Sequence, residues 1–115
     1  YKHIKDPSVQ AYAAMISAID DEVGHVIQAL EQKEMLSNSV IIFHSDNGGP
    51  RSAMFTGEVS TAGQTIPADN GPYRNGKGTL YEGGVRVVSL INWPEHIQAG
   101  TVVNEAIHVV DMYPT

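Results

Sequence analysis

The chain has 115 residues, of which 42% are hydrophobic and 17% are charged, and its formal net charge is −6. These proportions are typical of a globular protein rather than a disordered one, and the singly scattered lysines and arginines argue against a nucleic-acid surface. Cysteine is absent, so disulfides and thiol chemistry within the chain are excluded, and no apolar run is long enough to span a membrane.

An amphipathic helix is predicted for residues 9–30. Asp6 or Ser8 can cap its start, and Pro7 suits its first turn. The helix is expected to fray over residues 33–36. Its apolar side chains recur at alternating steps of three and four, which keeps them on one face: Val9, Tyr12, Ile16, Ile19, Val23, Val26 and Leu30.

Two buried strands are predicted, at residues 40–43 and within residues 83–93. The first reads Val-Ile-Ile-Phe. Four consecutive apolar residues, three of them β-branched, indicate a strand covered on both faces. Between the strands, residues 48–75 lack periodicity and form a long loop of the kind that is usually functional or mobile. The order of helix, strand, loop and strand predicts an α/β protein.

The segment Asp46-Asn47-Gly48-Gly49 closely follows the first predicted strand, at the point where that strand ends. Ligands of α/β sheets bind where strands end, and a carboxylate beside an amide suits a hard cation such as Ca²⁺ or Mg²⁺. The two glycines let the backbone bend tightly. Asp-Asn-Gly is also ordinary turn chemistry, so a purely structural turn remains an alternative on this segment alone.

A second segment, Gly76-Lys77-Gly78, sets one lysine between glycines, and Glu82, two further glycines and Arg86 follow it. Lys77 would present a compact ammonium group to an anionic oxygen. A tetrahedral anion held between a divalent cation and a lysine is suited to sulfuryl or phosphoryl transfer. The alternative is a surface hairpin with a solvated lysine.

Together these segments resemble the sulfatases of the alkaline phosphatase superfamily, most closely the arylsulfatase type that includes N-acetylgalactosamine-4-sulfatase. The resemblance covers nearly the whole chain and implies an α/β fold, an alkaline-phosphatase-like mixed sheet flanked by helices, of which this chain (residues 1–115) is a fragment. It rests on the order and spacing of these pieces: Tyr12-Ala13-Ala14-Met15 through Val23-Gly24, Ile42 to Gly49, Gly76 to Arg86, Asn92-Trp93-Pro94 and Asp111 to Thr115.

The resemblance also implies roles for individual residues. Asp46 and Asn47 would be two of the protein ligands of an active-site Ca²⁺, with Mg²⁺ less favoured. Lys77 would contact a sulfate oxygen of the substrate and act in catalysis. Glu82 and Arg86 would support the loop and strand without taking part in the chemistry.

The chain departs from the family pattern because it has no Cys-x-Pro-x-Arg or Ser-x-Pro-x-Arg segment, from which the formylglycine nucleophile is made. The nucleophile and the remaining metal ligands are therefore expected outside this chain, and the chain alone is expected to be inactive. Alternatives are a phosphate or phosphonate ester hydrolase of the same superfamily, or a non-catalytic cation-binding piece.

The expected partner is a sulfated small molecule or a sulfated saccharide, with specificity carried largely by loops such as residues 51–73. The first residue, Tyr1, suggests a piece of a longer polypeptide. Two strands and one helix bury too little apolar surface to support a parallel-type sheet alone, so folding is expected to need the rest of the domain. Family resemblance implies a secreted, periplasmic or lysosomal location.

Overall fold

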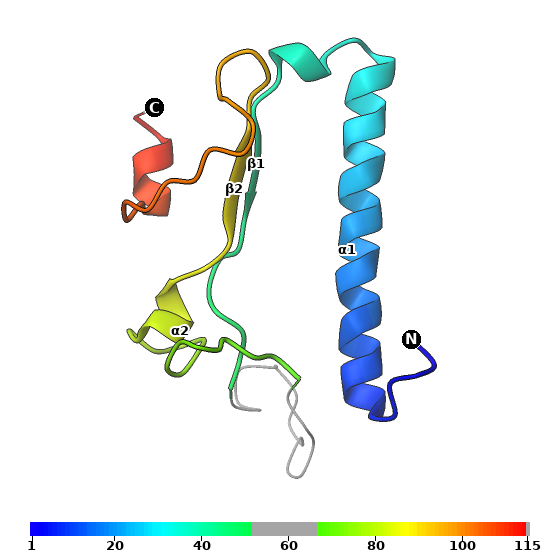
Figure 1. Cartoon of the computed structure of the whole chain (residues 1–115), viewed down its shortest axis with the longest axis vertical. Helices are drawn as coiled ribbons and strands as arrows, with labels where there is room; N and C mark the ends of the chain where they lie inside the picture. The colour runs from blue at the N-terminus through cyan, green and yellow to red at the C-terminus, as the bar shows by residue number, and fades with distance from the viewer. Residues whose placement is uncertain (52–66, 115) are drawn as a thin grey trace.

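A computed structural model describes residues 1–51 and 67–114. A long helix, α1 (Pro7–Gln32), stands beside a two-stranded sheet of β1 (Ile41–His44) and β2 (Ser89–Asn92) (Figure 1). In the described part of the chain, three short helices complete the order of elements: η1 (Leu36–Asn38), α2 (Glu82–Val85) and η3 (Val109–Met112). No helix in the described ranges is long and apolar enough to cross a membrane.

Helix α1 confirms the predicted amphipathic helix and its start. The Asp6 carboxylate accepts hydrogen bonds from the backbone N–H groups of Ser8 (2.8 Å) and Val9 (3.2 Å), which would otherwise be unpaired at the helix end. Pro7 is the first helical residue, where its missing N–H costs nothing. The helix ends at Gln32, just before the region where fraying was expected.

The two strands form an antiparallel ladder in which Ile42 faces Ile91 and His44 faces Ser89. The expectation of a parallel-type sheet is therefore wrong for this pair. The second strand is also shorter than predicted, because residues 82–85 form the helical turn α2 and the strand begins only at Ser89. The backbone of Gly83 and Gly84 is held in that turn by contacts with distant segments, which hydrophobic periodicity does not reveal.

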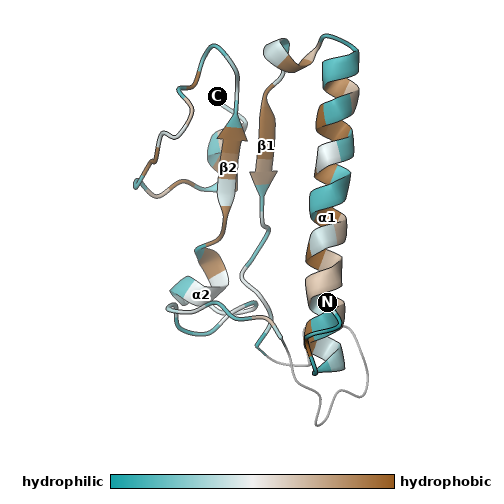
Figure 2. Ribbon diagram, turned by 45° about the vertical axis from the view of Figure 1, so that its right-hand side comes forward, coloured by the Kyte–Doolittle hydropathy of each residue, from teal (hydrophilic) through white to brown (hydrophobic). Residues whose placement is uncertain are grey.

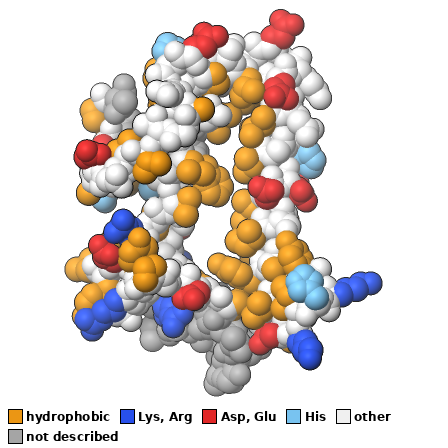
Figure 3. All heavy atoms as spheres, viewed as in Figure 1, with side chains coloured by type: hydrophobic (Ala, Val, Ile, Leu, Met, Phe, Trp, Pro, Cys, Tyr) orange, Lys and Arg blue, Asp and Glu red, His pale blue; other side chains and the backbone are white. Residues whose placement is uncertain are grey.

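The prediction that both strands are buried, the first of them on both faces, is wrong for this chain. Ile42 and Leu90 remain 48% and 61% exposed. Hydrophobic residues occur along α1 and both strands (Figure 2). Apolar side chains of α1 and of the sheet face each other across an open groove of about 520 Å³, lined by Val23, Ile27 and Phe43 among others (Figure 3). The helix does not close onto the strands, so neither apolar surface buries the other.

The short helix η3 begins with a capping box, in which two reciprocal hydrogen bonds close its first turn. The His108 Nδ1 atom accepts a hydrogen bond from the N–H of Val110 (3.2 Å), and the N–H of His108 donates to Asp111 Oδ2 (2.7 Å). Both hydrogen bonds are local to the start of η3.

Candidate functional site

The two segments singled out in the sequence lie at the same end of the sheet. Asp46 lies two residues beyond the end of β1, and α2 ends shortly before β2 begins at Ser89, so the antiparallel pairing brings the two segments together (Figure 1). The N–H of Ser45 donates to the Val88 carbonyl oxygen (3.1 Å) and continues the strand pairing by one step. The end of the sheet thus delivers the two segments to one place.

Backbone hydrogen bonds then join the two segments directly. The Gly48 N–H donates to the carbonyl oxygen of Gly84 (2.9 Å), and the Lys77 N–H donates to the carbonyl oxygen of Gly49 (3.2 Å). Gly48, Gly76, Gly83 and Gly84 are all buried. The predicted cation segment and the predicted lysine segment are therefore one structural unit.

Gly48 makes this approach possible because it has no side chain. A Cβ atom at this position would collide with the carbonyl oxygen of Gly83. Only hydrogen atoms on the Gly48 Cα allow the two backbones to lie so close. The glycines here are therefore required for packing, beyond the tight bend expected from the sequence.

A prediction follows for Gly48→Ala in the full-length protein. The added methyl group must displace backbone rather than a flexible side chain, so we expect a loss of about 1–3 kcal/mol in the free energy of unfolding, measured by denaturant titration. Gly24→Ala in α1 is the matched control, because, apart from its chain neighbours and the helix's own backbone, no described residue has an atom within 4 Å of its Cβ position. Alanine favours a helix, so the control should be neutral or stabilising by up to about 1 kcal/mol. Equal effects of the two changes would contradict the packing argument.

Asp46 and Asn47 present oxygen atoms at the strand end. Asp46 is exposed, and its carboxylate makes no hydrogen bond or ion pair with any residue that the structure describes. The Asn47 side-chain nitrogen donates to the Gly48 carbonyl oxygen (3.0 Å). The Asn47 side-chain oxygen is the atom that would face a cation. A carboxylate and an amide oxygen are donors suited to a hard cation.

The described ranges contain no group of three or more His, Asp or Glu side chains that could hold a metal ion. Ca²⁺ takes about six to eight oxygen ligands. Asp46 and Asn47 thus fit the chemistry of such an ion but supply only part of its coordination shell.

Lys77 is half-buried, and its ammonium group forms no ion pair with a carboxylate among the described residues. Its loop is nevertheless fixed at both ends. The Gly83 N–H donates to the Arg74 carbonyl oxygen (2.9 Å), and the Arg74 guanidinium stacks 3.9 Å from the centre of the Tyr81 ring. A cation over an aromatic face is attracted to the ring, so the loop is clamped by side chains as well as by backbone.

The support roles expected for Glu82 and Arg86 agree with their contacts. Arg86 Nη1 lies 3.6 Å from Glu82 Oε1, one helical turn away, and its guanidinium carbon lies 4.8 Å from the centre of the Tyr73 ring. Both side chains of the ion pair are more than half exposed. The Arg86–Tyr73 contact links the end of α2 to the loop before Lys77, whereas the exposed ion pair lies within the helical turn itself.

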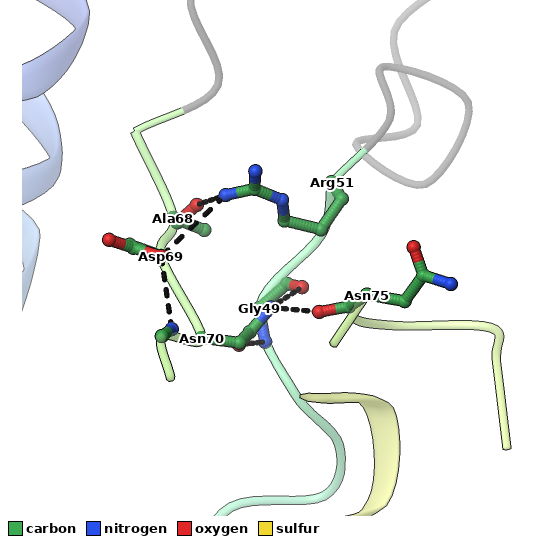
Figure 4. A network of polar contacts seen from close by, with 7 residues as sticks. Gly49, Arg51, Ala68, Asp69, Asn70 and Asn75 are labelled. Carbon is green, nitrogen blue, oxygen red and sulfur yellow. Dashed lines mark hydrogen bonds and ion pairs between the residues drawn. The ribbon is translucent and has the colours of Figure 1, made fainter. Parts of the chain in front are cut away.

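Sequence reasoning missed a third segment, residues 68–70, which lies against Gly49 (Figure 4). The Asn70 side chain bonds to both backbone polar groups of Gly49, and Arg51 reaches the Ala68 carbonyl oxygen (3.3 Å) and Asp69 (3.7 Å). Ala68 is 2% exposed. The sequence pattern indicates only a Gly- and Pro-rich loop here. Most of the proposed specificity loop, residues 52–66, lies outside the described residues.

The end of the sheet thus places a carboxylate and an amide on one segment beside a glycine-flanked lysine on the other. The family described as sulfatase matches residues 1–115. The chain therefore belongs to the sulfatase family, which confirms the resemblance seen in the sequence.

Several curated relatives are similar over most or all of the chain. Arylsulfatase J of Mus musculus is 38% identical over 115 residues, which cover 100% of this chain and 17% of that protein. Steryl-sulfatase of Homo sapiens is 33% identical over 104 residues, covering 90% and 17%. N-acetylgalactosamine-6-sulfatase of Homo sapiens is 32% identical over 104 residues, covering 90% and 18%.

The chain thus spans less than a fifth of the length of these curated relatives. No solved structure matches the chain.

Proposed function

We propose that this chain is part of the catalytic domain of an enzyme that hydrolyses sulfate monoesters. The observation that carries the proposal is the backbone tie between the two segments, in which Lys77 N–H bonds Gly49 O beside Asp46 and Asn47. Membership of the sulfatase family and relatives named arylsulfatase support sulfate as the transferred group. The full fold would be an alkaline-phosphatase-like mixed sheet flanked by helices.

In this proposal Asp46 and Asn47 bind Ca²⁺, with Mg²⁺ less favoured because it prefers rigid octahedral sites that retain water. The free carboxylate of Asp46 and the amide oxygen of Asn47 support this assignment. A bound Ca²⁺ would supply positive charge that polarises the sulfate group. Its other ligands, and the formylglycine nucleophile, would come from outside residues 1–115.

Lys77 would bind the sulfate group and offset the charge on a non-bridging or leaving oxygen as the ester S–O bond breaks. Its half-buried position and its freedom from carboxylate partners leave the ammonium donors for a substrate. The loop around it is held by Arg74, Tyr81 and Gly83, so the charge is placed before the substrate arrives. Preorganised charge of this kind stabilises a transition state more than mobile charge does.

A comparison of a sulfate ester with a phosphate ester as substrates tests the proposal. The full-length protein should hydrolyse nitrophenyl sulfate faster than nitrophenyl phosphate, measured as kcat/KM for each under the same conditions. Preference for the phosphate would favour a phosphate or phosphonate ester hydrolase, and no turnover of either would favour a non-catalytic cation-binding piece. Residues 1–115 alone are the negative control, because they lack a formylglycine segment and should give no turnover.

A further inference from the structure

The side-chain amide of Asn70 makes hydrogen bonds in both directions with one residue, Gly49 (Figure 4). The Gly49 N–H donates to Asn70 Oδ1 (2.7 Å), and Asn70 Nδ2 donates to the Gly49 carbonyl oxygen (2.9 Å). Because Gly49 offers one donor and one acceptor, this reciprocal pair allows only one orientation of the amide. Asn70 therefore holds Gly49 as a neighbouring strand would.

Gly49 is also the residue at which the two loops of the candidate site meet. Its carbonyl oxygen accepts hydrogen bonds from Asn70 Nδ2 and from the Lys77 N–H (3.2 Å). A carbonyl oxygen has two lone pairs, so it can serve both donors at once. Fixing Gly49 thus fixes the backbone of Lys77 and, two residues earlier in the chain, the proposed cation ligand Asn47.

The third hydrogen bond of Asn70 reaches the lysine loop directly. Asn70 Nδ2 donates to the Asn75 carbonyl oxygen (3.0 Å). Asn75 has a φ of 61°, in the left-handed region, where the chain turns toward Lys77. The Asn70 amide therefore contacts both loops, one through Gly49 and the other through Asn75.

The surroundings of Asn70 leave it little room to move. A Cβ atom at Gly76 would meet Asn70 Nδ2 at 2.6 Å, and one at Gly49 would meet the Ala68 Cβ at 2.8 Å. The neighbouring Arg51–Asp69 pair is much looser, at 3.7 Å with side chains 55% and 83% exposed. Exposed pairs of this kind contribute little, so the fixed geometry depends on Asn70 rather than on the ion pair beside it.

We propose that Asn70 is a positioning residue that sets the separation between the proposed cation ligands, Asp46 and Asn47, and the proposed sulfate-binding Lys77. The inference rests on the proposed function. Asn70 does not touch the substrate; it acts through Gly49 and Asn75. A displacement of about 1 Å in such a site can cost on the order of 10²-fold in rate.

The test uses Asn70→Asp in the full-length protein. This change keeps an acceptor for the Gly49 N–H but removes the donors to the Gly49 and Asn75 carbonyl oxygens, and it sets a charged oxygen against them. The matched control is Asp69→Asn, which makes the opposite exchange at the adjacent residue and keeps the acceptor that bonds the Gly71 N–H (3.0 Å). We expect kcat/KM for nitrophenyl sulfate to fall about 10- to 100-fold in Asn70→Asp and less than about twofold in Asp69→Asn.

A double-mutant cycle separates positioning from a general structural effect. If Asn70 acts through Lys77, adding Asn70→Asp to Lys77→Ala should lower kcat/KM by less than about twofold beyond Lys77→Ala alone. Full additivity of the two losses would overturn the proposal. So would wild-type activity in Asn70→Asp.

Amide hydrogen exchange gives a readout that does not need activity. The Lys77 amide should exchange faster in Asn70→Asp than in wild type or in Asp69→Asn, because its acceptor Gly49 is no longer held. Unchanged exchange would overturn the positioning role whatever the enzyme does. Faster exchange in a protein that fails to hydrolyse nitrophenyl sulfate would instead support the contact role and refute the proposed function.

Discussion

Replacing Lys77 with alanine in the full-length protein should lower the turnover of nitrophenyl sulfate by about 10²- to 10³-fold, the usual effect of removing one preorganised charge from a reacting group. The fold should survive, because the Lys77 side chain forms no ion pair with a described carboxylate, and the backbone N–H that bonds Gly49 remains. Steady-state kinetics and the melting temperature, measured on the same preparation, check both parts.

Lys33→Ala is the matched control for this prediction, because Lys33 is an exposed lysine just after the end of α1. It should leave turnover within about twofold of wild type, as surface substitutions away from special features usually do. Near-normal turnover in Lys77→Ala would remove Lys77 from the reaction. A large loss in both variants would point to a general charge effect instead.

Exchanging Asp46 for asparagine should weaken Ca²⁺ binding and, with it, sulfate ester hydrolysis. The change keeps the size of the side chain but removes one of the few charges that would hold the ion. Binding to the native state alone stabilises a protein by about 2.7 kcal/mol when the ligand is at 100 times its Kd. We therefore expect the rise in melting temperature caused by Ca²⁺ to shrink strongly in Asp46→Asn.

Asp21→Asn serves as the control, since Asp21 is an exposed carboxylate on α1. Its Ca²⁺-dependent rise in melting temperature should equal that of wild type. The comparison also separates the two site residues: Lys77→Ala should keep the Ca²⁺ effect and lose turnover, whereas Asp46→Asn should lose both. An undiminished Ca²⁺ effect in Asp46→Asn would remove Asp46 from the metal site.

Local sequence patterns predicted the elements whose causes are local. The period of apolar residues and the Asp6-Pro7 start specified α1, and the apolar run at residues 40–43 specified β1 to within one residue. The second strand is shorter than predicted because Gly83 and Gly84 lie in a helical turn. Hydrogen bonds with Arg74 and Gly48, which belong to other segments, hold that turn. A pattern within one segment does not report such contacts.

The same division applies to the candidate site. Residue type and glycine spacing single out Asp46, Asn47 and Lys77, and the hydrogen bond from the Lys77 N–H to the Gly49 carbonyl oxygen brings their two segments together. Asn70 was missed because its importance lies in three hydrogen bonds to backbone groups elsewhere in the chain. An asparagine in a glycine- and proline-rich loop looks the same whether or not it makes them.

The sequence by itself determined the long helix, the first strand and the residue types available for chemistry, because each depends on side chains close together along the chain. It also determined the family, through the order and spacing of short motifs. Only the tertiary structure decided that the strands are antiparallel, that α2 precedes the second one, and that Gly48 and Gly84 join the two loops. The physical reason is close backbone packing. Contacts between glycines produce no pattern of hydrophobic residues in the sequence, yet they fix the backbone positions of the segments that carry Asp46 and Lys77.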